Sequence, residues 1–102
     1  MKKIINGKKY DTDTASCVGS WDNGYGYSEF GYFSEALYRK KTGEFFLHGK
    51  GGAASKYAKS CGENSWSGGE EILPLTEDEA KKWAEGHLEA DEYEQIFGEV
   101  AE

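Results

Sequence analysis

The sequence predicts an α+β fold in which a small antiparallel β-sheet is covered on one face by C-terminal amphipathic helices. Two turn dipeptides, Asn6-Gly7 and Thr42-Gly43, each separate runs that suit short strands, as in β-hairpins. Clear helical periodicity is confined to the segment after residue 76. At 102 residues the chain is expected to form a single domain over residues 1–102.

The two predicted hairpins account for the first half of the chain. Ile4-Ile5 and residues 8–10 would form the first, and residues 33–41 and 44–49 the second, whose second arm is strongly apolar. Between them, Asp11 or Asp13 could cap a short helix that extends to about Ser20. Residues 21–27 are expected to form a loop, because glycine and asparagine interrupt them repeatedly.

A long glycine-rich segment follows the second hairpin. Residues 49–69 contain six of the fourteen glycines, which predicts an ordered loop with one helical turn near residues 55–59. Residues 71–75 suit a short strand, and Pro74 places that strand at an edge of the sheet.

Two helices are predicted at the C-terminal end. Thr76 and Glu79 have the spacing of a capping box, in which each side chain accepts a hydrogen bond from a free amide at the helix start. An apolar stripe follows at helical spacing: Ala80, Trp83, Ala84, His87 and Leu88. A second helix, capped by Asp91 and ended by Gly98, would bury Tyr93, Ile96 and Phe97.

Charge is distributed unevenly along the chain. Residues 76–102 hold ten carboxylates and two lysines, whereas residues 1–75 hold ten basic and nine acidic side chains. This pattern favours a basic partner and argues against direct binding to nucleic-acid phosphates. The carboxylates expected to contact such a partner are Asp78, Glu85, Glu89 and Glu92. The alternative is a solvated face stabilised by Glu77–Lys81 and Asp78–Lys82 pairs at i, i+4 spacing.

Aromatic residues are concentrated in a second segment. Six rings occur between residues 21 and 33, interleaved with glycines. We expect Trp21, Phe30 and Phe33 to be mostly buried in the core. Tyr25 and Tyr27 would be exposed and, with Trp66, would serve as contact anchors, since rigid rings bury much area for little lost entropy.

Motifs for chemistry are weak. Cys17, His48, Cys61 and His87 lack the short ligand pairs of structural zinc sites, so neither a metal nor a cofactor is expected, and the cysteines are expected to be free thiols. Residues 49–52 (GKGG) do not match a P-loop, and residues 64–69 do not match a nucleophile elbow. We therefore expect a protein that is not an enzyme, and the remaining alternative is a small enzyme that acts on a nucleotide or on the RNA of a nuclease. With no apolar run long enough for a membrane span or a signal peptide, it is expected to be cytoplasmic.

Several segments together resemble a known family. They are INGKKYDTDTA ending at Ala15, LYRKKTGEFFLHGKGG (37–52), SKYA (55–58), NSWSGGE (64–70) and LTEDEAKKWAEGHLEADEYEQIFGEV (75–100). The chain resembles short acidic proteins carried on plasmids, integrative elements and phages of Gram-positive bacteria, a setting that includes anti-CRISPR inhibitors. The resemblance covers nearly the whole chain and carries no catalytic or binding residues over to it.

This resemblance implies an anti-CRISPR-type inhibitor acting in a bacterial host cell. Its expected partner is a CRISPR effector, first the type II RNA-guided nuclease, whose guide–target duplex lies in a positively charged channel. The alternative is a nucleic-acid-binding accessory protein of a mobile element, which would use basic residues from three segments: Lys2, Lys3, Lys8, Lys9, Lys40, Lys41 and Lys50. Sequence alone leaves open the stoichiometry, the docking face and the role of residues 49–69.

Overall fold

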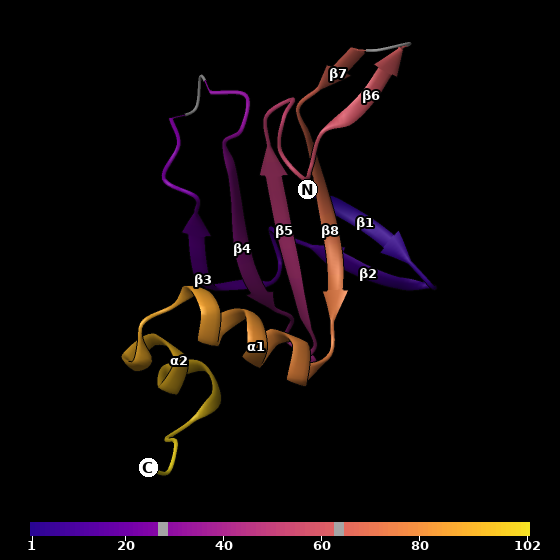
Figure 1. Ribbon diagram of the computed structural model, residues 1–102. Helices are drawn as coiled ribbons and strands as arrows, with labels where there is room; N and C mark the ends of the chain where they lie inside the picture. The colour runs from indigo at the N-terminus through magenta and orange to yellow at the C-terminus, as the bar shows by residue number, and fades with distance from the viewer. Residues whose placement is uncertain (27–28, 63–64) are drawn as a thin grey trace.

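A computed structural model describes residues 1–26, 29–62 and 65–102, apart from the side chain of Cys61. Its strands are β1 (Lys2–Ile5), β2 (Lys8–Asp11), β3 (Ser16–Asp22), β4 (Phe33–Arg39), β5 (Phe45–Gly51), β6 (Lys59–Gly62), β7 (Ser65–Ser67) and β8 (Gly69–Leu75). Two helices follow, α1 (Glu77–His87) and α2 (Ala90–Phe97). This is the α+β architecture predicted, with antiparallel sheets and C-terminal helices (Figure 1).

The main sheet has the strand order β3-β4-β5-β8 and is antiparallel throughout. Strands β6 and β7 form a separate hairpin between β5 and β8 in the chain. Pro74 lies on β8, an edge strand, as its missing amide proton requires. The register aligns Arg39 with Phe45 and Phe45 with Leu75, so this end of the sheet is the one from which α1 departs.

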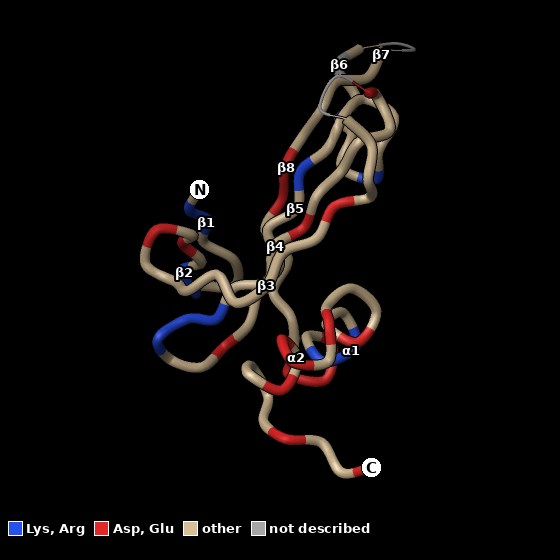
Figure 2. The backbone as a smooth tube through the Cα atoms, turned by 90° about the vertical axis from the view of Figure 1, so that its left-hand side faces the viewer, with Lys and Arg blue, Asp and Glu red and all other residues tan. Residues whose placement is uncertain are grey.

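The sheet separates two apolar clusters and is covered over part of each face. The β1–β2 hairpin packs on one face, where Tyr10 meets Phe46 and Ile72. The helices pack on the other, where Ala80 joins Leu37, Phe45 and Leu47, with Trp83, Ile96 and Phe97 around them. Figure 2 shows these layers from the side, with β1 and β2 to the left of the sheet and α1 and α2 to the right.

Both hairpin turns form where the sequence predicts them. Asn6 and Gly7 have φ of 51° and 78°, the left-handed values that a two-residue type I′ turn needs. Gly43 has φ of 93° in the turn between β4 and β5. Most residues other than glycine and asparagine rarely adopt these φ values, so asparagine and glycine at these positions specify the turns.

The helix predicted from Asp11 or Asp13 to Ser20 is wrong, because this segment forms β3. The Asp11 carboxylate accepts a hydrogen bond from the Asp13 amide at 2.9 Å, which is a turn contact instead of a helix cap. Beyond it, the chain pairs with β4 from Ser16 to Asp22. Pairing with a strand more than ten residues away in sequence therefore overrides the local helix signal.

The loop predicted over residues 49–69 is also only partly correct. Strand β5 continues to Gly51, and residues 59–62 and 65–67 form the β6–β7 hairpin. Between β5 and β6, the Ala58 amide donates to the Ser55 carbonyl at 3.1 Å, which closes a single turn. Gly69 begins β8, two residues before the strand predicted from sequence.

The helices follow their sequence signals closely. At the start of α1, the Thr76 hydroxyl accepts from the Glu79 amide and the Glu79 carboxylate accepts from the Thr76 amide, as the capping box predicts. Ala80 and Ala84 are fully buried on the predicted stripe. Helix α2 begins earlier than predicted, with Glu89 in place of Asp91 at the cap, and ends at Gly98. No helix in the described part of the chain is long and apolar enough to cross a bilayer.

Candidate protein-binding surface

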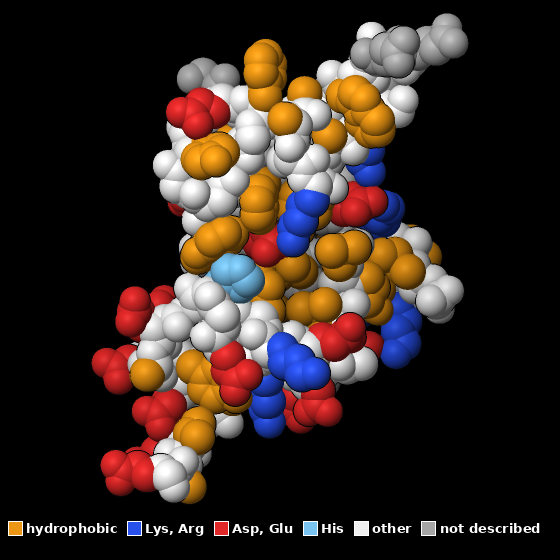
Figure 3. Space-filling view, viewed as in Figure 1, with side chains coloured by type: hydrophobic (Ala, Val, Ile, Leu, Met, Phe, Trp, Pro, Cys, Tyr) orange, Lys and Arg blue, Asp and Glu red, His pale blue; other side chains and the backbone are white. Residues whose placement is uncertain are grey.

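The acidic end comprises the ten carboxylates of residues 76–102. Ala80 and Ala84 turn one side of α1 toward the sheet, which leaves Asp78 and Glu85 on the exposed side. Glu89 and Glu92, at the start of α2, are also exposed. Figure 2 marks acidic positions along the backbone of the helices and the tail, and Figure 3 shows acidic side chains gathered at this helical end of the molecule. The structure therefore brings the four predicted acidic residues onto the same helical pair.

None of these ten carboxylates forms an ion pair among the described residues. The five ion pairs found among the described residues involve Glu35, Glu44, Glu70 and Glu71, none of which belongs to the acidic end. The Glu77–Lys81 and Asp78–Lys82 pairs, which belong to the alternative of a solvated face, are not among them. Instead, the Lys81 ammonium lies 5.8 Å from the centre of the Phe97 ring. The charge of the acidic end is therefore directed at the solvent.

Some carboxylates at the acidic end accept hydrogen bonds from backbone amides. A hydrogen bond from the Thr76 amide holds the pKa of Glu79 below its usual value, which stabilises the helix start. The Glu92 carboxylate accepts from the Glu89 amide at 3.2 Å, and the Glu94 carboxylate from the Val100 amide at 2.9 Å. Asp78 and Glu85 make no such contact within the described chain, so they are free to meet a partner.

The predicted aromatic anchors lie away from the acidic end. Asp22, Ser34 and Lys50 align at the far end of the sheet, so the connection containing Tyr25 and the β6–β7 hairpin with Trp66 project there (Figure 1). Tyr25 and Trp66 are both exposed, as expected. Tyr27 lies outside the described residues. The aromatic anchors and the acidic end therefore lie toward opposite ends of the sheet.

The burial expected for the other rings is only partly found. Phe30 is 75% exposed, which contradicts the prediction that it belongs to the core. Its carbonyl instead accepts the Ala54 amide at 2.8 Å, so the backbone is fixed while the ring points outward. Trp21 and Phe33 are half-buried, with their ring centres 5.6 Å apart.

A buried carboxylate, absent from the sequence predictions, connects three parts of the fold. Glu35 on β4 is only 3% exposed. It accepts hydrogen bonds from the Tyr57 hydroxyl, from Trp83 Nε1 on α1 at 3.0 Å, and from Lys56 Nζ at 2.7 Å. Burial alone would raise the pKa of Glu35, but the hydrogen bonds from these three donors outweigh it and hold that pKa below its usual value. We call these four residues the Glu35 cluster.

Tyr57 reaches this carboxylate by lying across Gly49 of β5. A Cβ atom built on Gly49 would overlap the Tyr57 ring, so only glycine leaves room for it. Burial, together with the hydrogen bond to Glu35, raises the pKa of Tyr57 well above its usual value, which keeps the hydroxyl protonated as a donor. All four groups satisfy one another, so the cluster ties the 52–58 turn and α1 to the sheet. One feature of the sequence could have indicated the cluster: Glu35 lies two residues before Leu37 in β4, so its carboxylate is on the apolar face of that strand.

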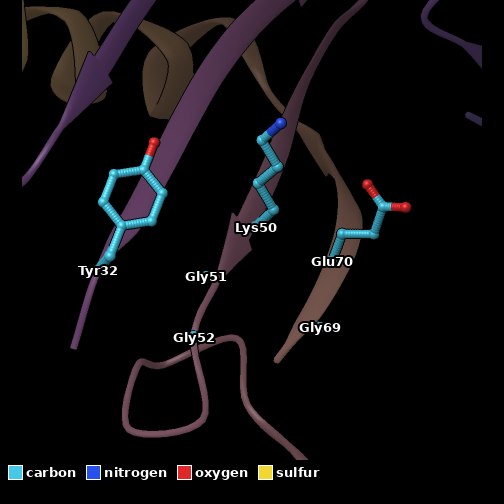
Figure 4. Close-up of a pocket in the computed structure, with 6 residues that line it drawn as sticks. All are labelled: Tyr32, Lys50, Gly51, Gly52, Gly69 and Glu70. Atoms are coloured by element: carbon cyan, nitrogen blue, oxygen red, sulfur yellow. The ribbon is translucent and has the colours of Figure 1, made fainter. Parts of the chain in front are cut away.

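The sheet face on which the β1–β2 hairpin packs carries, beyond that hairpin, a shallow cavity of about 460 Å³. Figure 4 shows Tyr32, Lys50 and Glu70 extending from neighbouring segments above a glycine floor. The Glu70 carboxylate lies 2.8 Å from His48 Nε2, and this hydrogen bond holds the pKa of Glu70 below its usual value. Lys50 lies on β5, not in the loop predicted, and Glu70 pairs with it across the strands. The adjacent negative charge disfavours an anion here.

The candidate metal ligands are dispersed. His48 lies on the sheet face that carries Tyr38, at 6.5 Å between ring centres, whereas His87 packs against Trp21 and Trp83 on the helical face. Cys17 is an exposed free thiol, and the side chain of Cys61 lies outside the described part. Among the side chains that the structure describes, no three metal-ligating groups gather at one point.

The lysines of the alternative hypothesis are partly brought together. Lys8, Lys9, Lys40 and Lys41 line a shallow cavity of about 350 Å³ beside the β1–β2 hairpin. However, Glu44 pairs with both Lys8 and Lys40, at 3.0 and 3.6 Å. This carboxylate neutralises part of the basic cluster.

Compared with protein-family models, with curated proteins and with solved structures, the chain matches none. The charge and shape of its surfaces are therefore the basis for assigning a function.

Proposed function

We propose that this protein is a non-enzymatic, anti-CRISPR-type inhibitor whose acidic end binds the basic nucleic-acid channel of a CRISPR effector. The observation that carries the proposal is the acidic end itself, with ten carboxylates, two lysines and no ion pair among the described residues. The type II RNA-guided nuclease is the first candidate, because its guide–target duplex occupies a positively charged channel. A bound acidic surface would compete with the phosphates of that duplex.

The geometry of the acidic end suits this role. Asp78 and Glu85 lie on a helix that Ala80 and Ala84 pack against the sheet, so their spacing is fixed before binding. A preorganised charged surface loses less entropy on binding than a flexible acidic tail. Its field also speeds the encounter with a basic partner, an effect that salt screens with a Debye length near 10 Å at about 0.1 M.

The second candidate is a nucleic-acid-binding accessory protein. The observation in its favour is the clustering of Lys8, Lys9, Lys40 and Lys41 around one cavity. The pairing of Glu44 with two of these lysines weakens the basic field, and the net charge of -7 opposes phosphate binding. We therefore place the acidic end first.

One cleavage assay separates the two candidates. The protein is titrated into a type II nuclease loaded with guide RNA, and cleavage of a matched DNA target is measured. The triple variant Asp78→Lys, Glu85→Lys and Glu89→Lys should lose inhibition, because it places like charges against the channel. Circular dichroism should show that its helices remain folded.

The matched control removes positive charge from the β1–β2 hairpin. Changing Lys2, Lys3, Lys8 and Lys9 to glutamine should leave inhibition intact if the protein acts as an acidic ligand. The opposite pattern, with the lysine variant inactive and the triple reversal fully active, would refute the acidic surface and favour the accessory protein. Binding of the unmodified protein to plain duplex DNA or RNA at moderate salt would point the same way.

A further inference from the structure

A hollow of about 400 Å³ lies within the acidic end, between the two helices. Its lining combines apolar and acidic side chains from α1, α2 and the C-terminal tail: Ala84, Glu85, Leu88, Ala90, Tyr93, Glu94 and Val100. Figure 3 shows hydrophobic side chains set among carboxylates at this end of the molecule. The hollow therefore differs from the rest of the acidic surface in offering apolar area.

Contacts on two sides fix the shape of the hollow. The Leu88 side chain packs tightly against β3, since a Cβ atom on Gly19 would lie 2.7 Å from Leu88 Cδ1. On the other side, Glu94 holds the tail twice: its carbonyl accepts the Gly98 amide at 2.8 Å and its carboxylate accepts the Val100 amide at 2.9 Å. These contacts place Val100 as a wall of the hollow, although its side chain remains 58% exposed.

We propose that this hollow binds one apolar side chain of a partner protein, from a segment in which lysine or arginine flanks that apolar residue. The lining supplies the apolar contact, and Glu85 and Glu94 at the hollow are complementary to flanking cations. The inference rests on the proposed function, because it uses the same acidic end, and it adds the local sequence that this surface would recognise.

The two parts of this recognition have different physical signatures. Attraction between the carboxylates and the flanking cations is long-ranged and weakens with salt. Burial of the apolar side chain is short-ranged, depends on shape and persists as salt rises. A binding surface with both parts discriminates among basic partners, because charge alone would accept any of them.

Two synthetic peptides separate charge from apolar contact. One has the sequence Lys-Lys-Leu-Lys-Lys and the other Lys-Lys-Gly-Lys-Lys, so their charges are equal. Each is titrated into the ¹⁵N-labelled full chain at moderate salt, and binding is followed by amide chemical shifts. The leucine peptide should bind about tenfold more tightly, as expected for burial of most of one aliphatic side chain. Its shifts should centre on Leu88, Tyr93 and Val100.

A pair of variants gives the matched control. Val100→Asp adds a carboxylate but removes an apolar wall, so the preference for leucine should disappear while binding of the glycine peptide is kept or strengthened. The Val100 amide still donates to Glu94, so the tail should stay in place. Ile4→Asp adds the same charge on β1, where Ile4 is 63% exposed on the other side of the sheet. This variant should keep the leucine preference.

Equal binding of the two peptides, no binding of either, or an unchanged leucine preference in Val100→Asp would each overturn the hollow as a recognition site. These outcomes are distinct from failure of the proposed function. If nuclease inhibition is absent but the leucine preference is present, the CRISPR effector is the wrong partner and the hollow remains. If charge reversal abolishes inhibition but the peptides bind equally, the function remains and the hollow does not.

Discussion

Replacing Tyr57 with phenylalanine tests whether the Glu35 cluster holds the fold together. The substitution removes one hydroxyl and leaves the ring, so the packing of the ring is kept. Glu35 would keep the hydrogen bonds from Trp83 Nε1 and Lys56 Nζ but lose the one from Tyr57. The carboxylate would stay buried, because Glu35 is 3% exposed, and it would have one donor fewer.

The size of the effect follows from the charge on the acceptor. A hydrogen bond to a charged group contributes about 1.5–3 kcal/mol, against about 1 kcal/mol for a neutral pair. We therefore expect Tyr57→Phe to lower the free energy of unfolding by about 1.5–3 kcal/mol at neutral pH. For a domain of this size each kcal/mol lowers the melting temperature by roughly 4–8 °C. The loss is large relative to a total stability of about 5–15 kcal/mol.

The pH dependence gives the same test a second readout. The pKa of Glu35 is lowered in the folded state, so its contribution to stability is present above the pKa of the unfolded chain and is lost as pH falls through the folded value. Losing the Tyr57 donor raises the folded pKa and reduces that contribution. The stability difference between the two proteins should therefore be widest at neutral pH and narrow below about pH 4, near the usual pKa of glutamate.

Urea unfolding followed by circular dichroism measures both quantities. Tyr10→Phe is the matched control, because Tyr10 is also buried but its hydroxyl makes no hydrogen bond among the described residues. The control should lose less than about 0.5 kcal/mol, because phenylalanine keeps the contacts of the Tyr10 ring with Phe46 and with Lys40 Nζ. Equal losses in the two variants, or a Tyr57→Phe loss that does not change with pH, would refute the role given to the cluster.

Two further substitutions test the packing around these elements. Gly49→Ala should lower the free energy of unfolding by about 1–3 kcal/mol, because the added methyl overlaps the Tyr57 ring; a melting temperature equal to that of the unmodified protein would contradict this. Gly86→Ala should stabilise the protein by about 0.4–1 kcal/mol, since Gly86 is an exposed residue of α1 with open space around its Cα; a lower denaturation midpoint would show that the helix is not formed there.

Elements specified by neighbouring residues could be predicted from sequence. Asn6-Gly7 and Gly43 provide the turn conformations, and Thr76 with Glu79 provides the helix start. Strand β3 could not be predicted in this way, because its stability depends on pairing with β4 on the far side of a ten-residue connection. The local signal at Asp11 was real, but it specifies a turn.

The candidate surfaces also differ in whether local sequence patterns or contacts between distant residues specify them. The excess of carboxylates after residue 76 is visible in the composition, and the amphipathic stripe shows which side of α1 is exposed. The Glu35 cluster depends on partners 22 and 48 residues away in sequence, Tyr57 and Trp83, which no local pattern connects. The hollow depends on the tail turning back so that Val100 meets Glu94, a contact made only after Gly98 ends α2.

The sequence separation within the Glu35 cluster also bears on how the protein is made. Synthesis proceeds from the N-terminus, so β4 leaves the ribosome well before Trp83 does. Until α1 emerges, the nascent sheet holds a carboxylate without one of its donors, which is unfavourable to bury, and an apolar face without its cover, which is unfavourable to expose to water. The strands of the main sheet therefore gain the stabilisation that α1 supplies only after Trp83 has been synthesised, so pairing of the strands alone does not complete the fold.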